Sequence, residues 1–207
     1  MHIWRKRSLL TGLSVLAGVC LVPSYLRAYK ITGGSEVPTV LVGDTIVVNN
    51  AAYRLNLPYT RVKLFRTGAP RRGDFVFLHL PDRPRLRGFF KRVIGLPGET
   101  IELRENQVLI DGRPLPTAPL DPAAFAWAPK GHPIGSIVES EDGHWVTFTP
   151  GKSRDRNHPP TRLAEGEYFL LGDNRDGSLD SRDFGPVPEA FFQGKVIAVL
   201  PTGARAK

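Results

Sequence analysis

Residues 88–112 read GFFKRVIGLPGETIELRENQVLIDG. The first seven are mostly aromatic and β-branched, which predicts a strand. Two further short strands, Ile101–Leu103 and Gln107–Ile110, flank a turn at Glu105-Asn106, and Asp111-Gly112 is a second turn signal. This stretch therefore predicts short strands joined by tight turns.

Short apolar runs continue on both sides of this stretch. They lie at Thr45–Val48, Asp74–Leu80, Trp145–Thr149, Tyr168–Leu171 and Lys195–Leu200. Glycine (21) and proline (19) make up nearly a fifth of the 207 residues, which favours turns over long helices. Outside the N-terminal segment, only Pro188–Phe192 has a helical pattern. The chain is therefore predicted to be mainly β, with an antiparallel-sheet domain.

The N-terminal segment has the composition of a membrane anchor. Three consecutive cations, residues 5–7, precede the uncharged run Ser8–Leu26. These nineteen residues suffice to cross a bilayer core of about 30 Å. Trp4 and Tyr25 flank the run in the way that interfacial aromatic residues do.

We therefore expect a cytoplasmic N-terminus (residues 1–7), a single transmembrane helix (residues 8–28) in the cell (inner) membrane, and the remainder on the extracytoplasmic side. A cleaved signal peptide is the main alternative, and a buried core helix is another. Cleavage is disfavoured because Leu26-Arg27-Ala28 places a large residue at the −3 position.

Residues 113–163 differ from their surroundings, because proline, alanine, glycine and histidine are frequent there. We expect an inserted variable lobe here, between two blocks of one β-domain at residues 29–112 and 164–207. Three of the five histidines lie in the insert at irregular spacing: His132, His144 and His158. They form no metal-ligand pattern, and the single cysteine, Cys20, lies in an apolar run, so we expect no metal site.

Much of the net charge of +8 comes from residues 51–92, which contain eleven Lys or Arg and only two acidic residues, Asp74 and Asp82. A basic surface attracts anionic lipid or nucleic acid. The alternative interpretation is an ordinary solvent-exposed face that binds no partner. The predicted anchor favours anionic membrane lipid. A nucleic-acid-binding protein is a weak alternative, because no recognition helix or aromatic RNA-binding pattern accompanies the charge.

Ser35 is a candidate nucleophile, because Gly33 and Gly34 before it let the backbone approach a substrate closely. An ordinary linker is the alternative interpretation. A serine hydroxyl needs a base near neutral pH, and no histidine has the context of a Ser-His-Asp triad. Lys91 lies in the apolar strand of residues 88–94, where burial would disfavour an ammonium and make a lysine a base. A side chain pointing to solvent is the competing interpretation.

Residues 172–185 read GDNRDGSLDSRDFG and follow an apolar strand. Aspartate and arginine at these offsets can pair and brace a loop, and Ser178 and Ser181 offer hydroxyls to a neighbouring lysine. A calcium loop is the competing interpretation, but the terminal glutamate is missing and two arginines interrupt the acids.

These three segments together resemble the type I signal peptidase (leader peptidase) family, serine proteases with a Ser/Lys dyad. Residues 91–99, KRVIGLPGE, match the lysine box of that family, and residues 172–185 match its final box. The boxes occur in the family's order, after an N-terminal anchor. The resemblance covers residues 8–112 and 165–200. The nucleophile box is matched at Ser35, Pro38, Thr39, Gly43 and Asp44.

The resemblance implies a role for each matching residue. Ser35 would be the nucleophile, with its backbone N–H donating to the oxyanion, and Lys91 would be the general base. Ser178 would hydrogen-bond to Lys91 and orient it. The residues that brace the site or support the lysine strand would be Asp180, Arg182 and Arg92.

Two residues depart from the family pattern. Glu36 replaces the methionine after the nucleophile, where it would line the substrate cleft, and its carboxylate could pair with a lysine and oppose base function. Gly33 stands where many members have a serine that supplies a second oxyanion donor. We expect these two residues, with Gly34 and Pro38, to border the oxyanion site and substrate cleft.

The resemblance implies a membrane-bound endopeptidase that removes N-terminal signal peptides from exported preproteins through an acyl-enzyme, without a cofactor. It also implies a mainly β fold with an inserted lobe. The expected partners are preproteins and anionic membrane lipids. Two alternatives follow from the departures: a conjugative-transfer-type peptidase with a dedicated substrate, and a catalytically silent, membrane-anchored peptide-binding domain.

Overall fold

The computed structural model describes residues 24–58, 60, 62–81, 88–105, 107–121, 123, 136–140, 143–148 and 157–202. The predicted cytoplasmic N-terminus and residues 8–23 of the predicted anchor lie outside this set. Within it, no helix has both the length and the apolar character needed to cross a membrane.

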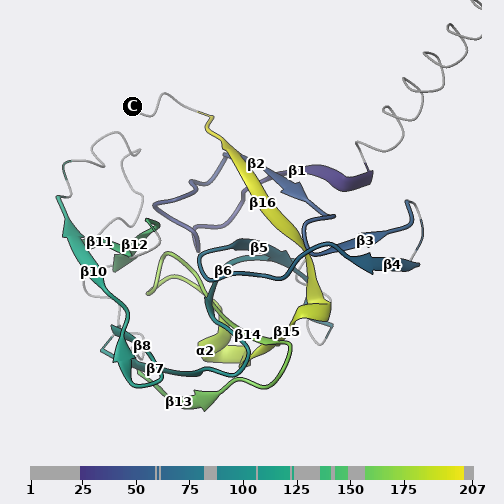
Figure 1. Cartoon of the computed structure of the whole chain (residues 1–207). Helices are drawn as coiled ribbons and strands as arrows, with labels where there is room; N and C mark the ends of the chain where they lie inside the picture. The colour runs from purple at the N-terminus through teal and green to yellow at the C-terminus, as the bar shows by residue number, and fades with distance from the viewer. Residues whose placement is uncertain are drawn as a thin grey trace, which may run out of the picture.

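Seven antiparallel strands form the largest sheet (Figure 1). Five of them confirm the strands predicted from apolar runs, including the one that carries Lys91. The order across the sheet is β1 (Leu26–Lys30), β2 (Thr45–Asn49), β16 (Phe192–Leu200), β5 (Phe75–Leu78), β6 (Phe89–Gly95), β14 (Glu167–Leu171) and β15 (Val187–Pro188).

Strand β1 corrects one boundary of the sequence prediction. The last three residues of the predicted anchor, 26–28, belong to this strand and pair with β2, in a register that aligns Leu26 with Asn49. The backbone carbonyl of Tyr25 also accepts a hydrogen bond from the backbone N–H of Asn50. These residues therefore form an edge strand of the sheet, because β2 supplies partners for their backbone groups.

A second sheet has the order β13 (His158–Arg162), β7 (Thr100–Arg104), β8 (Gln107–Ile110) and β9 (Arg113–Pro114). The predicted β7–β8 hairpin is confirmed. Glu105 and Asp111 adopt positive φ angles of 49°, and Gly112 adopts 76°, as tight turns require.

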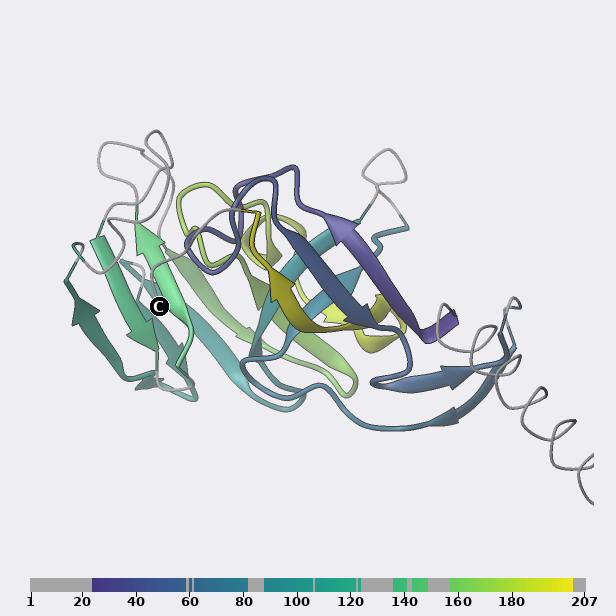
Figure 2. The same cartoon turned by 90° about the horizontal axis from the view of Figure 1, so that it is seen from above.

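The molecule carries two further groups of strands at opposite ends, a three-stranded sheet and a two-stranded hairpin (Figures 1 and 2). The sheet contains β10 (Thr117–Leu120), β11 (Ser136–Ser140) and β12 (Trp145–Phe148), and the hairpin joins β3 (Arg54–Asn56) to β4 (Lys63–Arg66). The three-stranded sheet lies within the predicted insert at residues 113–163. However, β9 and β13 at the two ends of that insert belong to the sheet of the β7–β8 hairpin.

Two short helical segments occur near the end of the described chain. The 3₁₀ helix η2 (Glu189–Phe191) lies within the segment predicted to be helical, whereas α2 (Ser181–Phe184) was not predicted. A capping box starts α2: Asp180 accepts from the backbone of the first turn, and the Asp183 carboxylate accepts from the Asp180 N–H. This cap fixes Asp180 at the end of the loop that follows β14.

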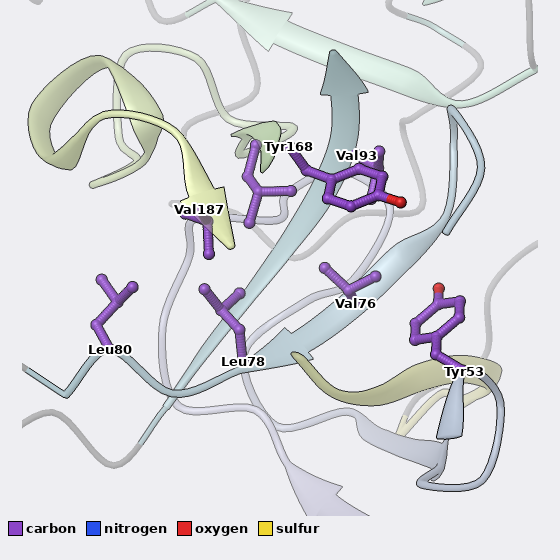
Figure 3. Close-up of a cluster of buried hydrophobic side chains, with 8 residues drawn as sticks. Tyr53, Val76, Leu78, Leu80, Val93, Tyr168 and Val187 are labelled. Atoms are coloured by element: carbon purple, nitrogen blue, oxygen red, sulfur yellow. The ribbon is translucent and has the colours of Figure 1, made fainter. Parts of the chain in front are cut away.

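The central strands are buried on both faces, which explains their nearly continuous apolar sequences. Along β5, Val76 and Leu78 enter one core cluster, while Phe75 and Phe77 enter another. Strand β14 alternates in the same way, because Tyr168 and Leu170 join the first cluster, drawn in Figure 3, and Phe169 and Leu171 join a third. Strands β5, β6 and β14 are therefore fixed from both sides.

Candidate active site

Ser35 lies in the loop of residues 31–44, which connects β1 to β2. The loop is anchored at its far end, where both carboxylate oxygens of Asp44 accept hydrogen bonds, one from the backbone N–H of Leu41 at 2.8 Å and the other from that of Thr202 at 3.1 Å. Ile31 and Val40 pack into the second core cluster. The sequence around Ser35 thus folds as a braced turn.

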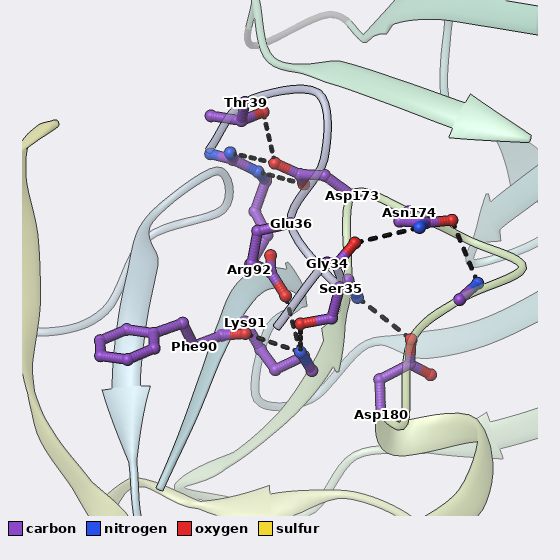
Figure 4. A network of polar contacts seen from close by, with 12 residues as sticks. Gly34, Ser35, Glu36, Thr39, Phe90, Lys91, Arg92, Asp173, Asn174 and Asp180 are labelled. Atoms are coloured by element: carbon purple, nitrogen blue, oxygen red, sulfur yellow. Dashed lines mark hydrogen bonds and ion pairs between the residues drawn. The ribbon is translucent and has the colours of Figure 1, made fainter. Parts of the chain in front are cut away.

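The loop after β14 holds the Ser35 turn from the other side. The backbone N–H of Asn174 donates to the Ser35 carbonyl oxygen, and its side-chain Nδ2 donates to the Gly34 carbonyl oxygen, both at 3.0 Å. The Thr39 hydroxyl donates to Asp173 Oδ2 at 2.6 Å. Residues about 140 positions apart in the sequence are therefore clamped together next to the nucleophile (Figure 4).

Lys91 reaches this turn from β6, where it stands opposite Val76 of β5. Its side chain is buried, with only 1% of the residue surface exposed. Nζ donates to Ser35 Oγ at 2.9 Å, to Glu36 Oε1 at 2.6 Å and to the Phe90 carbonyl oxygen at 2.7 Å. Ser35 and Lys91 are thus in direct hydrogen-bond contact, as general base catalysis requires.

Glu36 is buried beside the pair, with 2% of its side chain exposed, and forms an ion pair with Lys91. Burial raises the pKa of Glu36 to about 7, against the opposing charge of Lys91, and the nearby Asp173 carboxylate adds to the rise. The predicted pairing of Glu36 with a lysine is therefore present, and the lysine is Lys91.

Arg92 points to the opposite face of β6 and binds Asp173 through two hydrogen bonds, from Nε at 2.8 Å and from Nη2 at 2.6 Å. Its Nη1 donates to the Gly73 carbonyl oxygen. Burial by itself would raise the pKa of Asp173, but Arg92, with smaller contributions from His144 and Thr39, outweighs burial and lowers it. Arg92 thus connects the lysine strand to the loop that clamps Ser35.

Asp180 and Arg182 form a buried two-point ion pair, with both oxygen–nitrogen distances at 2.8 Å. Asp180 also accepts from the backbone N–H of Gly172, which fixes the strand end before the clamp. Ser178 is buried in this region with 1% exposure and lies against Gly172. Its expected hydrogen bond to Lys91 stays a prediction.

A cavity of about 180 Å³ opens next to the Ser35–Lys91 contact. Residues 30–33 form one wall and residues 88–90 the other, with Ser35, Glu36 and Lys91 also lining it. At Gly33, an added Cβ would meet no atom within 4 Å, so this edge is open, whereas Pro38 is buried behind the turn. Within the described part of the chain, the Ser35 backbone N–H donates to no other backbone group, which suits an oxyanion donor.

Sequence reasoning did not single out Asp173, Asn174 and Thr39 as site residues. Asp173 and Asn174 follow the apolar strand β14 after Gly172, and polar residues at the end of a buried strand are a signal that could have identified them. In the alternative interpretation as a calcium loop, Asp173 and Asp180 would be among the ligands. Each is paired with a different arginine, so their carboxylates serve the framework of the loop.

The sequence of this chain is similar to those of several known proteins. The family model described as "Signal peptidase, peptidase S26" matches residues 4–200. Signal peptidase I of Pseudomonas aeruginosa is 31% identical, covering 89% of this chain and 68% of its own length. Signal peptidase I V of Bacillus subtilis is 30% identical, covering 88% of this chain and 90% of its own length.

A crystal structure of a signal peptidase I from Enterococcus faecalis is also 31% identical, over 63% of this chain and 98% of the other, with a TM-score of 0.35. The assignment therefore rests on sequence. The family model covers most of the chain, and the matched residues include the buried Ser35–Lys91 contact. On this evidence, the chain belongs to the signal peptidases of peptidase family S26.

Proposed function

We propose that this chain is a serine endopeptidase that removes N-terminal signal peptides from preproteins, with Ser35 as nucleophile and Lys91 as general base. The observation that carries the proposal is the 2.9 Å contact between Lys91 Nζ and Ser35 Oγ at the end of an open cavity. Lys91 comes from a strand buried on both faces, so its position is fixed before substrate arrives.

In the first step, neutral Lys91 takes the proton of Ser35 Oγ while Oγ attacks the scissile carbonyl carbon. The oxyanion lies at the backbone N–H of Ser35, and Gly33 contributes no side-chain donor. Lys91 then gives its proton to the leaving amine, which leaves an acyl-enzyme. A water molecule, activated by Lys91 in the same way, hydrolyses the ester and frees Ser35.

The substrate would enter as an extended segment between residues 30–33 and residues 88–90. Ile31, Phe89 and Phe90 give this cavity apolar walls, and its volume of about 180 Å³ favours small side chains at the −1 and −3 positions. The Lys30 side of the cavity is polar and open. Because Glu36 also lines the cavity, the residue preference next to the cleavage site would differ from that of relatives with methionine there.

The proposal includes an N-terminal membrane anchor, with the catalytic domain on the extracytoplasmic side. Its support is the uncharged run that follows three cations in the sequence. An anchored enzyme meets an anchored preprotein in two dimensions, at a raised effective concentration. The basic residues between 51 and 92 would face anionic head groups, and replacing several of them should weaken binding to anionic vesicles but not to neutral ones.

One observation favours the alternative of a silent peptide-binding domain. The Glu36 carboxylate lies 2.6 Å from Lys91 Nζ, and an ammonium held in an ion pair is not a base. A dedicated-substrate peptidase is favoured by the same residue, because Glu36 alters the lining of the cavity.

The test is cleavage of a model preprotein in detergent by the intact chain, with Ser35→Ala and Lys91→Met beside it. Lys195→Met is the matched control, because Lys195 also pairs with a carboxylate, Asp74 at 2.5 Å, but lies outside the site. The proposal is supported if only the parent and the control cleave the preprotein, and if they cleave it after a site with small residues at −3 and −1. A folded parent that cuts none of several model preproteins would overturn it.

A further inference from the structure

The carboxylate of Glu36 is the feature of the site that the peptidase mechanism does not use. It replaces the methionine of the family pattern and stands within hydrogen-bond distance of the general base. Both side chains of the pair are 2% exposed, so solvent reaches neither charge directly. A proton can therefore pass between Lys91 Nζ and Glu36 Oε1 over 2.6 Å without leaving the protein.

Several charged or titratable groups surround Glu36. Lys91 of β6 lowers its pKa, and Asp173, from the loop after β14, raises it. Arg92 binds Asp173, and His144 Nε2 lies 4.0 Å from Asp173 Oδ1. Burial is the largest influence and brings the pKa of Glu36 to about 7, so protonated Glu36 is accessible near neutral pH.

With one proton between them, the two groups have two arrangements. In the first, Lys91 is an ammonium and Glu36 a carboxylate, and in the second both are neutral. Each arrangement has no net charge, and the low dielectric of a buried site favours the neutral pair more than water would. Because no proton is exchanged with solvent, the ratio of the two arrangements does not depend on pH.

We propose that Glu36 is a positioning residue that holds the proton of Lys91, so that the shared proton, and not bulk pH, fixes the fraction of Lys91 available as a base. The proposal rests on the Ser35/Lys91 chemistry given above. Before attack, an N–H bond of Lys91 breaks and an O–H bond of Glu36 forms. Nζ then accepts the Ser35 proton and later passes it to the leaving amine, while Glu36 keeps its own proton.

This order has an electrostatic consequence. During attack Glu36 is neutral, so the new ammonium of Lys91 is not cancelled by a carboxylate at 2.6 Å. Its charge is then free to stabilise the developing oxyanion in the same cavity. When the leaving amine has taken the proton from Lys91, the pair is again neutral and can activate water in the same way.

The proposal predicts the shape of the pH profile. Once the pair has lost its second proton, near pH 7, the active fraction is constant, so kcat/KM should be level over the following pH units. In Glu36→Gln the amide cannot take up the proton, and Lys91 must release it to solvent. The kcat/KM of the variant should then increase with pH where that of the parent is level, so the ratio of variant to parent kcat/KM should change with pH.

The experiment measures kcat/KM from pH 6 to 9.5 for the intact parent, Glu36→Gln and Glu36→Met on one preprotein. Glu189→Gln is the matched control, since Glu189 pairs with Arg66 at 2.5 Å outside the site and its profile should follow the parent. Parallel profiles for the parent and both Glu36 variants overturn the proposal. The proposal is also overturned if both Glu36 variants fold but are inactive at every pH, because Glu36 would then have a direct catalytic role.

A second readout separates this proposal from the proposed function. Infrared difference spectra above pH 8, where the pair holds one proton, should contain a buried carboxylic acid band that is lost in Glu36→Gln and kept in Glu189→Gln. The band without peptidase activity in the parent would refute the peptidase chemistry while leaving the shared proton in place. Peptidase activity that requires Ser35 and Lys91, without the band above pH 8, would refute the shared proton alone.

Discussion

Arg92 and Asp173 form a buried two-point ion pair that joins the strand of the general base to the loop that clamps the nucleophile. The residue before Arg92 is Lys91, and the residue after Asp173 is Asn174, which binds the backbone of Ser35 and Gly34. This ion pair therefore connects the two segments that position the members of the candidate dyad.

We predict that Asp173→Asn destabilises the protein by about 3–5 kcal/mol, because it leaves the Arg92 guanidinium buried without a charge partner. Activity should fall in addition, since the Thr39 and Arg92 contacts both end on this carboxylate. Denaturant unfolding measures the first effect and preprotein cleavage the second. Glu102→Gln, which removes a pair with the exposed Arg104, is the control and should cost less than about 1 kcal/mol.

The same pair predicts a loss of stability in acid. Arg92 holds the pKa of Asp173 below its ordinary value despite burial. An acid with a lowered folded-state pKa stabilises the fold above its unfolded pKa, and this stabilisation is lost as pH falls through the folded value. The stability difference between the parent and Asp173→Asn should therefore shrink as the solution is acidified below pH 4. A difference that stays constant to pH 2 would contradict this.

A third prediction concerns the close approach of Gly172 to Ser178. A Cβ at position 172 would lie 2.1 Å from Ser178 Oγ and 2.7 Å from the Ser35 carbonyl oxygen. Gly172→Ala should therefore cost about 1–3 kcal/mol and reduce kcat, because the nucleophile turn must move. Gly33→Ala is the matched control in the same site, where nothing lies within 4 Å of the added atom. Equal effects of the two substitutions would refute this interpretation.

A fourth prediction uses the open space at Gly33. Gly33→Ser would restore the hydroxyl that many family members have two residues before the nucleophile. If that hydroxyl reaches the oxyanion, kcat should rise toward the 10²–10³-fold that is roughly the scale of one such donor, with little change in KM. Gly33→Ala separates the hydroxyl from the added carbon. Identical kinetics for the serine and alanine variants would show that a hydroxyl at position 33 adds no hydrogen bond to the oxyanion.

The sequence predicted the strands that are apolar, short and bounded by turn residues, because those signals are local. It did not predict β13, whose sequence HPPTR contains two prolines, and this strand forms only because it pairs at the edge of a sheet with β7. Helix α2 was missed because four residues carry no period, although its Asp180–Asp183 capping box was readable.

The candidate dyad was predicted from motif resemblance, while its environment depended on contacts far apart in the sequence. A lysine in an alternating strand can face solvent or the core, and the Ser35 turn and β5 decide the outcome for Lys91. The role of Asp173 depends on Thr39, 134 positions away. No local pattern encodes such a distance, so the clamp around Ser35 could be described only from the fold.

The last prediction concerns how the stability contribution of Glu36 varies with pH. Burial raises the pKa of this acid from an ordinary 4.5 to about 7 in the folded chain, so the folded state binds a proton more tightly than the unfolded state. The favourable contribution is complete below pH 4.5 and is lost as pH rises to 7. Glu36→Gln has no such titration, so its stability relative to the parent should increase by about 3 kcal/mol across this window. Parallel urea unfolding of the two proteins at several pH values measures the change, and Glu36→Met should show the same trend. A difference that does not vary with pH would mean that the folded pair takes up no second proton in this window, and the raised pKa of Glu36 would be refuted.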